Sequence, residues 1–273
     1  MSNREIFFVI SNFNTDPEQY LEYCSDYIIY DQSSDDSIKT TLERKYNKIK
    51  FVENSGHNLT NYFRYFGEHW QDLPDVMMLV KGNMIGRHIS LEFFERVSRS
   101  RVFTHLYDDR SYKDIPGVSS QLYDGHFLEL NTSWYMRSKS FDYFSSFNEL
   151  LRFIFKSPLI PTWLVFSPGG CFILRKEHVK HYPAEFWNNL RKIVSYRFFP
   201  AEAYIIERML PIIFSGVYEL NSWMLNITDF NSELQKVVSG HHPCLDRGFS
   251  RLRHRFKAKL HRVIGILGSI IKR

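Results

Sequence analysis

Four groups of polar residues follow short apolar segments in the first third of the chain. They occupy residues 11–14, 31–36, 54–58 and 81–83. In an open α/β sheet, ligands bind beyond the carboxyl ends of the strands, which is where such groups would gather. A nucleotide placed over them could be contacted at its base or ribose by Asp31 and at its phosphates by Lys81. Ordinary strand-to-helix loops contain the same turn-forming residues, so the pattern by itself leaves both interpretations open.

Asparagines and histidines extend this candidate site. The amides of Asn54 and Asn58 could donate hydrogen bonds to a ribose or a diphosphate. His88 and His126 could contact phosphate or sugar, although scattered single histidines are usually structural. Next to Pro243, the His241-His242 pair has no partner Cys/His pair at a regular spacing, so a loop is expected there rather than a zinc site.

Short strands that alternate with helical segments would bring the polar groups to one edge of a sheet. Helical character is expected at Glu18–Cys24 and at Leu59–Trp70, where apolar residues recur at helical spacing. Four apolar segments have the length of buried strands, namely Ile6–Ser11, Asp26–Tyr30, Ile49–Val52 and Val76–Val80. This alternation is typical of βαβ units and predicts an α/β fold with a parallel sheet.

The remainder of the chain is expected to be mainly helical. Ser90 is a suitable N-cap for a short helix, and Pro183 should start a fresh helix inside a longer helical region. A loop that enters a strand is expected at Phe166–Leu174. The later helices are expected at Asn148–Phe155, Lys176–Ser195 and Pro200–Phe214.

Three stretches resemble glycosyltransferases. YIIYDQSSDDS, which starts at Tyr27, resembles the start of a GT-A-type nucleotide-sugar transferase, in which the second strand ends in Asp and a Ser/Asp-rich loop. Residues 53–88 and 168–190 resemble a little-characterised family of glycosyltransferase-like domains. The positions that match its pattern are Asn54, Gly56, Leu73, Pro74, Asp75, Gly82, His88 and Glu207. The resemblance covers roughly residues 5–216.

The resemblance implies a GT-A-like, Rossmann-like mixed sheet flanked by helices, with a nucleotide-sugar donor bound over it. Together with the strand ends, it assigns ten residues to the donor: Ser11, Asn12, Asp31, Asn54, Gly56, Asn58, Lys81, Gly82, Asn83 and His88. Gly169 and Gly170 would let the main chain approach an acceptor sugar, with His126 as a further acceptor contact. A simple tight turn would explain the two glycines equally well.

The chain departs from the metal-dependent pattern at one place. Metal-dependent GT-A enzymes carry Asp-x-Asp after the strand that corresponds to Val76–Val80, and its carboxylates help to hold Mg²⁺ or Mn²⁺. This chain has Lys81-Gly82-Asn83 instead. A lysine there could replace the charge of the metal at the leaving phosphate, so neither Mg²⁺ nor Mn²⁺ is expected as a cofactor. The nearest alternative acidic pair, at Asp108 and Asp109, has no clear place in the fold.

An inverting transferase also needs a base for the acceptor hydroxyl, usually a carboxylate. Glu207 is the first candidate for this base, and Asp124 and Glu202 are the next candidates. Alternatively, Glu207 is a glutamate on a helix surface that pairs with a neighbouring arginine, such as Arg208 or Arg191, and has no catalytic role. Because the Asp-x-Asp motif is missing, two other classes stay open: a non-catalytic nucleotide- or sugar-binding scaffold, and a transferase of another phosphate-linked group to a glycan.

The cysteines indicate a reducing compartment. Cys24, Cys171 and Cys244 are too few and too scattered for a disulfide framework. Each is expected to be a small buried apolar residue. No stretch of apolar residues is long enough to span a membrane, so a cytoplasmic protein is predicted.

The C-terminal segment carries most of the positive charge. Residues 247–273 contain nine Lys or Arg and no acidic residue, so subtracting +9 from the net charge of +5 leaves −4 for the preceding residues. Within residues 249–272, basic residues alternate with an apolar set spaced by three and four positions. That set is Phe249, Leu252, Phe256, Leu260, Val263, Ile264, Leu267, Ile270 and Ile271.

This pattern predicts a basic amphipathic helix that lies on an anionic membrane surface. A terminal helix packed on the body, or a nucleic-acid contact, would also use such a segment, but the body has no basic face with interleaved aromatics. We therefore expect a transferase domain at residues 1–240 and a membrane-associating tail at 241–273. The predicted enzyme is peripheral at the inner face of the cell membrane, uses a nucleotide-sugar and a saccharide or lipid-linked acceptor for surface polysaccharide, and binds no nucleic acid.

Overall fold

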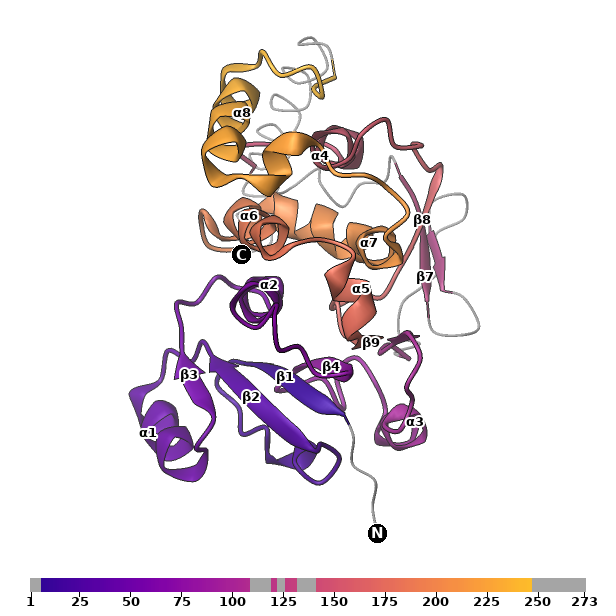
Figure 1. Cartoon of the computed structure of the whole chain (residues 1–273). Coiled ribbons are helices and arrows are strands. Elements are labelled where there is room, and N and C mark those ends of the chain that lie inside the picture. Colours follow the sequence, from indigo (N-terminus) through magenta and orange to yellow (C-terminus); the bar gives the residue numbers. More distant parts are fainter. Residues whose placement is uncertain (1–5, 109–118, 122–125, 132–140, 247–273) are drawn as a thin grey trace, which may run out of the picture.

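A mixed six-stranded sheet forms the lower part of the molecule as drawn in Figure 1, below a group of helices. The computed structural model describes residues 6–108, 119–121, 126–131 and 141–246. Four strands are parallel, namely β1 (Phe7–Asn12), β2 (Asp26–Asp31), β3 (Ile49–Phe51) and β4 (Val76–Lys81). Two further strands, β9 (Phe172–Arg175) and β5 (Thr104–His105), extend the sheet in the order β3-β2-β1-β4-β9-β5. Because β9 is antiparallel to β4, the predicted mixed α/β sheet is confirmed in its Rossmann-like form.

Side chains of the central strands alternate between two apolar cores. On β1, Phe8 and Ile10 enter one core, whereas Val9 enters the other. The first core also receives Leu42 from α1 (Asp36–Lys45) and Phe94 from α3 (Leu91–Val97). The sheet therefore has helices on both faces, because each face of a fully buried strand must be covered.

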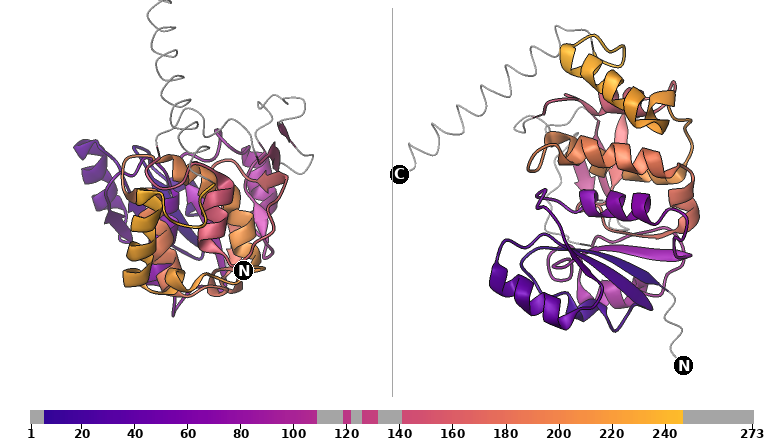
Figure 2. Two further views of the ribbon diagram at one scale, coloured as in Figure 1. Left: turned by 90° about the horizontal axis from the view of Figure 1, so that it is seen from above. Right: turned by 60° about the vertical axis from the view of Figure 1, so that its left-hand side comes forward.

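The second core is larger and consists mainly of helices. It contains α2 (Leu59–Glu68), α6 (Ala184–Ser195) and α7 (Ala201–Ser215). The two views in Figures 1 and 2 show α2 between the sheet and α6, so α2 has apolar neighbours on both sides. Seven of its ten residues are accordingly buried.

A smaller antiparallel sheet lies beside α7. It is formed by β6 (Ser119–Gln121), β7 (Phe127–Leu130) and β8 (Trp163–Phe166). The other elements are η1 (Glu18–Tyr20), α4 (Phe147–Ile154), α5 (Lys176–Lys180), η3 (Ser222–Leu225) and α8 (Ile227–Ser239).

Several local predictions are confirmed. Ser90 caps α3 by accepting a hydrogen bond from the Phe93 amide, and Pro183 is the residue from which α6 starts. The three cysteines are free and buried, as predicted.

Other local predictions were wrong or incomplete. The helix expected at Glu18–Cys24 is only the single 3₁₀ turn η1, because Tyr20 turns inward to the core and the chain enters β2 soon afterwards. The sequence reading also missed α1 and α8. Only Leu42 is buried on α1, so this helix has almost no apolar stripe to reveal it.

Near its end, the described chain packs back on the body. Gly240 ends α8 in the left-handed conformation, and Cys244 is buried beyond it. The segment predicted to be an amphipathic helix, 249–272, lies outside the described residues. None of the described helices is both long and apolar enough to cross a membrane.

Candidate functional site

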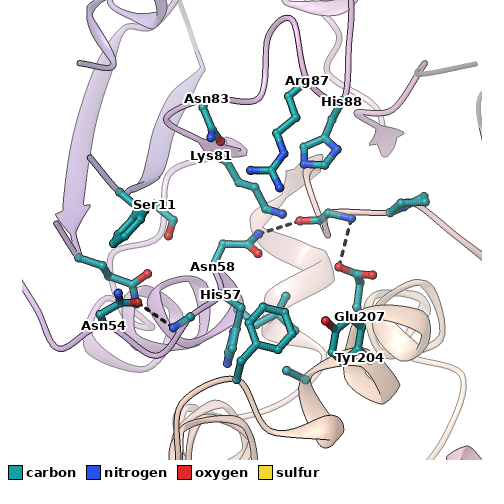
Figure 3. Close-up of a pocket in the computed structure, with 18 of the residues that line it drawn as sticks. Ser11, Asn54, His57, Asn58, Lys81, Asn83, Arg87, His88, Tyr204 and Glu207 are labelled. Atoms are coloured by element: carbon teal, nitrogen blue, oxygen red, sulfur yellow. Dashed lines mark hydrogen bonds between the residues drawn. The ribbon is translucent and has the colours of Figure 1, made fainter. Parts of the chain in front are cut away.

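A pocket of about 660 Å³ opens at the carboxyl edge of the parallel strands (Figure 3). The chain runs from β1 outward to β2 and β3 on one side, then returns to place β4 on the other side of β1. Ser11 of β1 and Lys81 of β4 are paired in register, so both strand ends reach the pocket together. The pocket thus lies at the point where the strand order reverses, which is the usual ligand position in open α/β sheets.

Nine of the residues predicted from the sequence line this pocket. They are Ser11, Asn54, Gly56, Asn58, Lys81, Asn83, His88, Gly169 and Glu207. They come from segments that are far apart in the chain, and the fold brings them to one cavity.

Three other candidate residues do not line the pocket but connect the strand ends next to it. The Asn12 amide donates to Asp31 Oδ1 and to the Thr15 carbonyl, both at 2.8 Å, and its oxygen accepts from the Thr15 hydroxyl. Asp31 is fully buried, and the Ser33 hydroxyl also donates to it. A Cβ atom on Gly82 would lie 2.0 Å from Asn12 Oδ1, so only glycine fits there. These residues fasten the ends of β1, β2 and β4 together and do not line the cavity.

One wall of the pocket is positively charged. Lys81 and Arg87 both line it, and Figure 3 shows their side chains directed to the same space as His88. Across the described residues, no carboxylate forms an ion pair with Lys81 or Arg87. The loop that carries both is held by Tyr20, whose hydroxyl donates to the Lys81 carbonyl at 2.8 Å and accepts from the Met84 amide. The two cations therefore face the same space, and Glu207 is the one carboxylate among the described residues that line it.

The N-terminus of α2 adds to this positive character. Gly56, His57, Asn58 and Leu59 line the pocket, and the helix begins at Leu59. Asn58 stands at the N-cap position, yet its side chain makes no cap hydrogen bond. Since the N-terminus of a helix carries a partial positive charge, this end of α2 favours an anionic ligand.

The opposite wall contains a single acidic residue among the described lining residues, Glu207 of α7. Its Oε2 accepts from the Gly169 amide at 3.1 Å, and its side chain keeps 20% of its surface exposed. Burial raises the pKa of the Glu207 carboxyl, although the charges of Arg208 and Lys81 oppose that rise. A carboxylate with a raised pKa that opens onto a cavity has the properties of a proton acceptor.

Gly169 lies between the positive wall and Glu207. Its φ of +93° lies in the region that favours glycine, and a Cβ there would approach Lys81 Nζ at 3.4 Å. Asn58 donates to the Gly169 carbonyl at 2.9 Å. The turn therefore favours glycine, and a Cβ there would be in ordinary contact with Lys81.

Aromatic residues form part of the rim. Phe13 and Phe198 line the pocket with 47% and 68% of their surface exposed. Phe199 has a φ of +45°, and its amide donates to the Ser55 carbonyl, which draws the 196–200 loop over the start of α2. A residue other than glycine in this conformation costs about 1–3 kcal/mol, a cost that is concentrated at functional sites.

Sequence reasoning missed Arg87 and this aromatic rim. Arg87 immediately precedes His88, so its position beside a predicted site residue was the signal that could have found it. The rim aromatics Phe13, Phe198, Phe199 and Tyr204 had no such signal, because aromatic residues are frequent throughout this chain.

His57 lines the pocket from the segment just before α2. Its Nε2 lies 2.8 Å from the Val194 carbonyl, so this nitrogen must carry the proton. Burial lowers the pKa of His57 to about 4, which keeps the ring neutral at physiological pH. The ring therefore contributes shape and contacts rather than charge.

Four further candidates lie outside the pocket lining. Glu202 is fully buried and accepts from the Tyr143 and Phe144 amides and from the Tyr196 hydroxyl, so it holds the protein framework. His126 lies against His105, with ring centroids 3.6 Å apart. Gly170 faces Leu59 and Leu210, and Asp124 lies outside the described residues.

The described lining offers few ligands for a divalent cation. Mg²⁺ in nucleotide sites is usually bound by one or two carboxylates together with the phosphates of the ligand. Here the described lining offers Glu207 alone as a carboxylate, and that residue faces two cationic side chains. The described residues as a whole contain no group of three or more His, Cys, Asp or Glu that could hold a metal ion.

Comparison with known proteins places the chain in a family. Neither a curated protein nor a solved structure gives a significant match. The family described as "Protein of unknown function (DUF3431)" matches residues 9–222, a range that contains the pocket and all of the six-stranded sheet except the first two residues of β1. This match covers more than half of the chain, so the protein belongs to the DUF3431 family.

Proposed function

We propose that this protein is a glycosyltransferase that binds the diphosphate of a nucleotide-sugar donor in the pocket at the ends of β1 and β4. The observation that carries the proposal is the pair of cations, Lys81 and Arg87, which share a pocket with the N-terminus of α2 and with one carboxylate. Two positive side chains and a helix N-terminus, which outweigh the one carboxylate among the described lining residues, suit a ligand with more than one negative charge.

The fold supports this assignment. The pocket lies at the reversal point of a Rossmann-like sheet, where nucleotides bind in many α/β proteins. Lys81-Gly82-Asn83 follows β4, the strand after which a metal-dependent GT-A enzyme has Asp-x-Asp. Lys81 at that place, with Arg87 lining the same pocket, favours direct neutralisation of the diphosphate, so the proposed GT-A-like enzyme works without a divalent cation.

The proposed transfer uses Glu207 as the base. The acceptor hydroxyl oxygen forms a bond to the anomeric carbon of the donor sugar, and its proton passes to the Glu207 carboxylate. The bond between the anomeric carbon and the diphosphate oxygen breaks, and its electron pair stays on the leaving diphosphate. Lys81 and Arg87 stabilise the charge that develops there.

The proposed acceptor is a saccharide, carried on a lipid at the inner face of the cell membrane, in surface polysaccharide synthesis. The basic segment 247–273 supports this choice, since its nine cationic residues favour an anionic bilayer. An enzyme held at that surface would meet lipid-linked acceptors at high local concentration.

Calorimetric titration with uridine, guanosine and cytidine diphosphates, each with and without EDTA, tests donor binding. We expect at least one nucleoside diphosphate to bind equally well in EDTA and to compete with its nucleotide-sugar. Turnover is followed as release of the diphosphate from the same nucleotide-sugars, with saccharide acceptors.

The outcomes separate the competing functions. Diphosphate release in EDTA supports the metal-independent transferase. Tight donor binding without turnover on any acceptor would identify a binding scaffold instead, and release of a different phosphate-linked group would identify another transferase. If no nucleoside diphosphate binds, the assignment of this pocket is wrong.

A further inference from the structure

Apolar side chains gather on one surface of the small sheet and on the loop before it. Leu159, Ile160, Trp163 and Val165 expose 79%, 37%, 43% and 40% of their surface. Trp163 and Val165 are cross-strand partners of Leu130 and Leu128, so the four residues share one face of the sheet. We call these six residues, Leu128, Leu130, Leu159, Ile160, Trp163 and Val165, the apolar patch.

The opposite face of the same strands explains why the patch points outward. Phe127, Glu129, Leu164 and Phe166 are buried beneath it. From α7, Arg208 forms a buried ion pair with Glu129 and stacks over the Phe166 ring. Side chains of β8 alternate between its two faces. Leu164 and Phe166 pack on the α7 side, so Trp163 and Val165 lie on the outer face. No described helix lies on the outer side of β8 (Figure 1). Exposed contiguous apolar surface of this kind marks a contact with a protein or a membrane.

The described chain ends at a helix that precedes the same region. Asp246, the final described residue, pairs with Arg152 of α4 at 2.9 Å, and its amide donates to Glu149 of that helix. α4 ends at Ile154, only five residues before Leu159. The strongly cationic residues 247–273 therefore start from the helix that leads into the apolar loop.

We propose that the apolar patch is a membrane-contact surface of the folded body, which rests on an anionic lipid bilayer beside the basic segment. Cationic residues are attracted to anionic headgroups, and leucine, isoleucine and tryptophan favour the interface below them. The sequence that follows Asp246 contains nine cations and no acid, which favours an anionic bilayer over a protein partner. The proposal does not depend on the transfer chemistry.

The two contacts should respond differently to salt. Attraction between the basic segment and the bilayer is screened as ionic strength rises, whereas burial of apolar side chains is not. At low salt both contacts contribute to binding. At high salt, the remaining binding should depend mainly on the apolar patch.

Trp163 provides a direct measurement in the full-length protein. Vesicles of phosphatidylcholine and phosphatidylserine that contain brominated acyl chains quench tryptophans that enter the bilayer. We expect quenching in the wild type that disappears in Trp163→Phe. We also expect Leu159→Asp to weaken vesicle binding about tenfold, because a charge replaces an exposed apolar side chain in the contact.

Val102→Asp is the matched control, since Val102 is 68% exposed and lies outside the patch. It should bind vesicles like the wild type. Replacing Arg251, Arg253 and Arg255 with glutamine should reduce binding at low salt while Trp163 quenching persists at high lipid concentration.

Three results would overturn the proposal. One is wild-type binding by Leu159→Asp together with no quenching of Trp163, which would leave the basic segment as the sole contact. Another is a change of oligomeric state in Leu159→Asp, seen by sedimentation, with unchanged vesicle binding. The third is failure of the wild-type protein to bind phosphatidylserine vesicles at all.

Discussion

Asn58 and Glu207 both hydrogen-bond to the main chain of Gly169, from opposite sides of the pocket. Asn58 donates to the Gly169 carbonyl at 2.9 Å, and Glu207 accepts from the Gly169 amide at 3.1 Å. Through this residue the start of α2 is connected to the middle of α7. The same connection holds the Glu207 carboxylate at a fixed place relative to the start of α2, as the positioning of a base within a ligand pocket requires.

Replacement of Glu207 by glutamine should abolish transfer while leaving donor binding intact. The glutamine oxygen can still accept from the Gly169 amide, so the variant removes the charge and the basicity alone. We expect turnover to fall about a hundredfold or more, with a nucleoside diphosphate affinity close to that of the wild type.

The pH profile gives a second readout for Glu207. Burial raises the pKa of this carboxyl, and the base must be ionised, so the wild-type rate should rise with pH through a pKa above the usual glutamate value. That rising limb should be missing from the residual activity of Glu207→Gln. The control is Glu185→Gln, an exposed residue on α6; equal losses in both variants would contradict the assignment.

Replacement of Lys81 or Arg87 by methionine should weaken nucleoside diphosphate binding. Each loses a charge-assisted contact to phosphate, which corresponds to roughly a tenfold to hundredfold rise in Kd. Calorimetry measures the change directly. Lys192→Met, on the exposed side of α6, should bind like the wild type. Unchanged affinity in Lys81→Met would remove this residue from the phosphate site.

The Gly82→Ala substitution should destabilise the protein. The new Cβ would lie 2.0 Å from Asn12 Oδ1 and 2.6 Å from the Thr15 hydroxyl, so the frame beneath the pocket must shift. We expect a loss of about 1–3 kcal/mol in the free energy of unfolding, measured by urea denaturation.

An Asn12→Ala background provides the control for Gly82. It removes the clashing oxygen, so Gly82→Ala should cost less there than in the wild type. Equal costs in both backgrounds would show that Asn12 is not the residue that excludes a side chain at position 82.

Glu202 should make stability depend on pH. Burial raises its pKa from 4.5 to about 7, so the folded state holds this proton more tightly than the unfolded state. The contribution of protonated Glu202 to the free energy of unfolding is fully present below pH 4.5 and is lost as the pH rises toward and through 7. The difference is on the order of 3 kcal/mol between those limits.

The Glu202→Gln variant should lack this dependence. Relative to it, the wild type should lose stability between pH 5 and about 8, as measured by urea denaturation at each pH. His57 has a lowered pKa, so it removes stability as the pH falls below 6.5. Because both proteins contain His57, its effect cancels in the comparison. A constant difference across this range would mean that Glu202 is already ionised at low pH.

The four parallel strands and the edge at which polar residues collect could be predicted from the sequence, whereas α1 and α8 could not. Runs such as Val76–Val80 are apolar throughout because they are buried on both faces, and that property is visible without any structure. The polar groups could be located because each directly follows one of these apolar segments. The basic character of 247–273 is likewise a matter of composition alone.

Only the tertiary structure decided which of those residues line the pocket and which support it. Asp31 and Lys81 both follow parallel strands, yet Asp31 is buried against Asn12, whereas Lys81 faces the cavity. The distinction depends on contacts between residues far apart in the chain, which periodicity does not record. Glu207 and Gly169 are 38 positions apart, and the packing of α7 beside β8 brings the carboxylate to that amide.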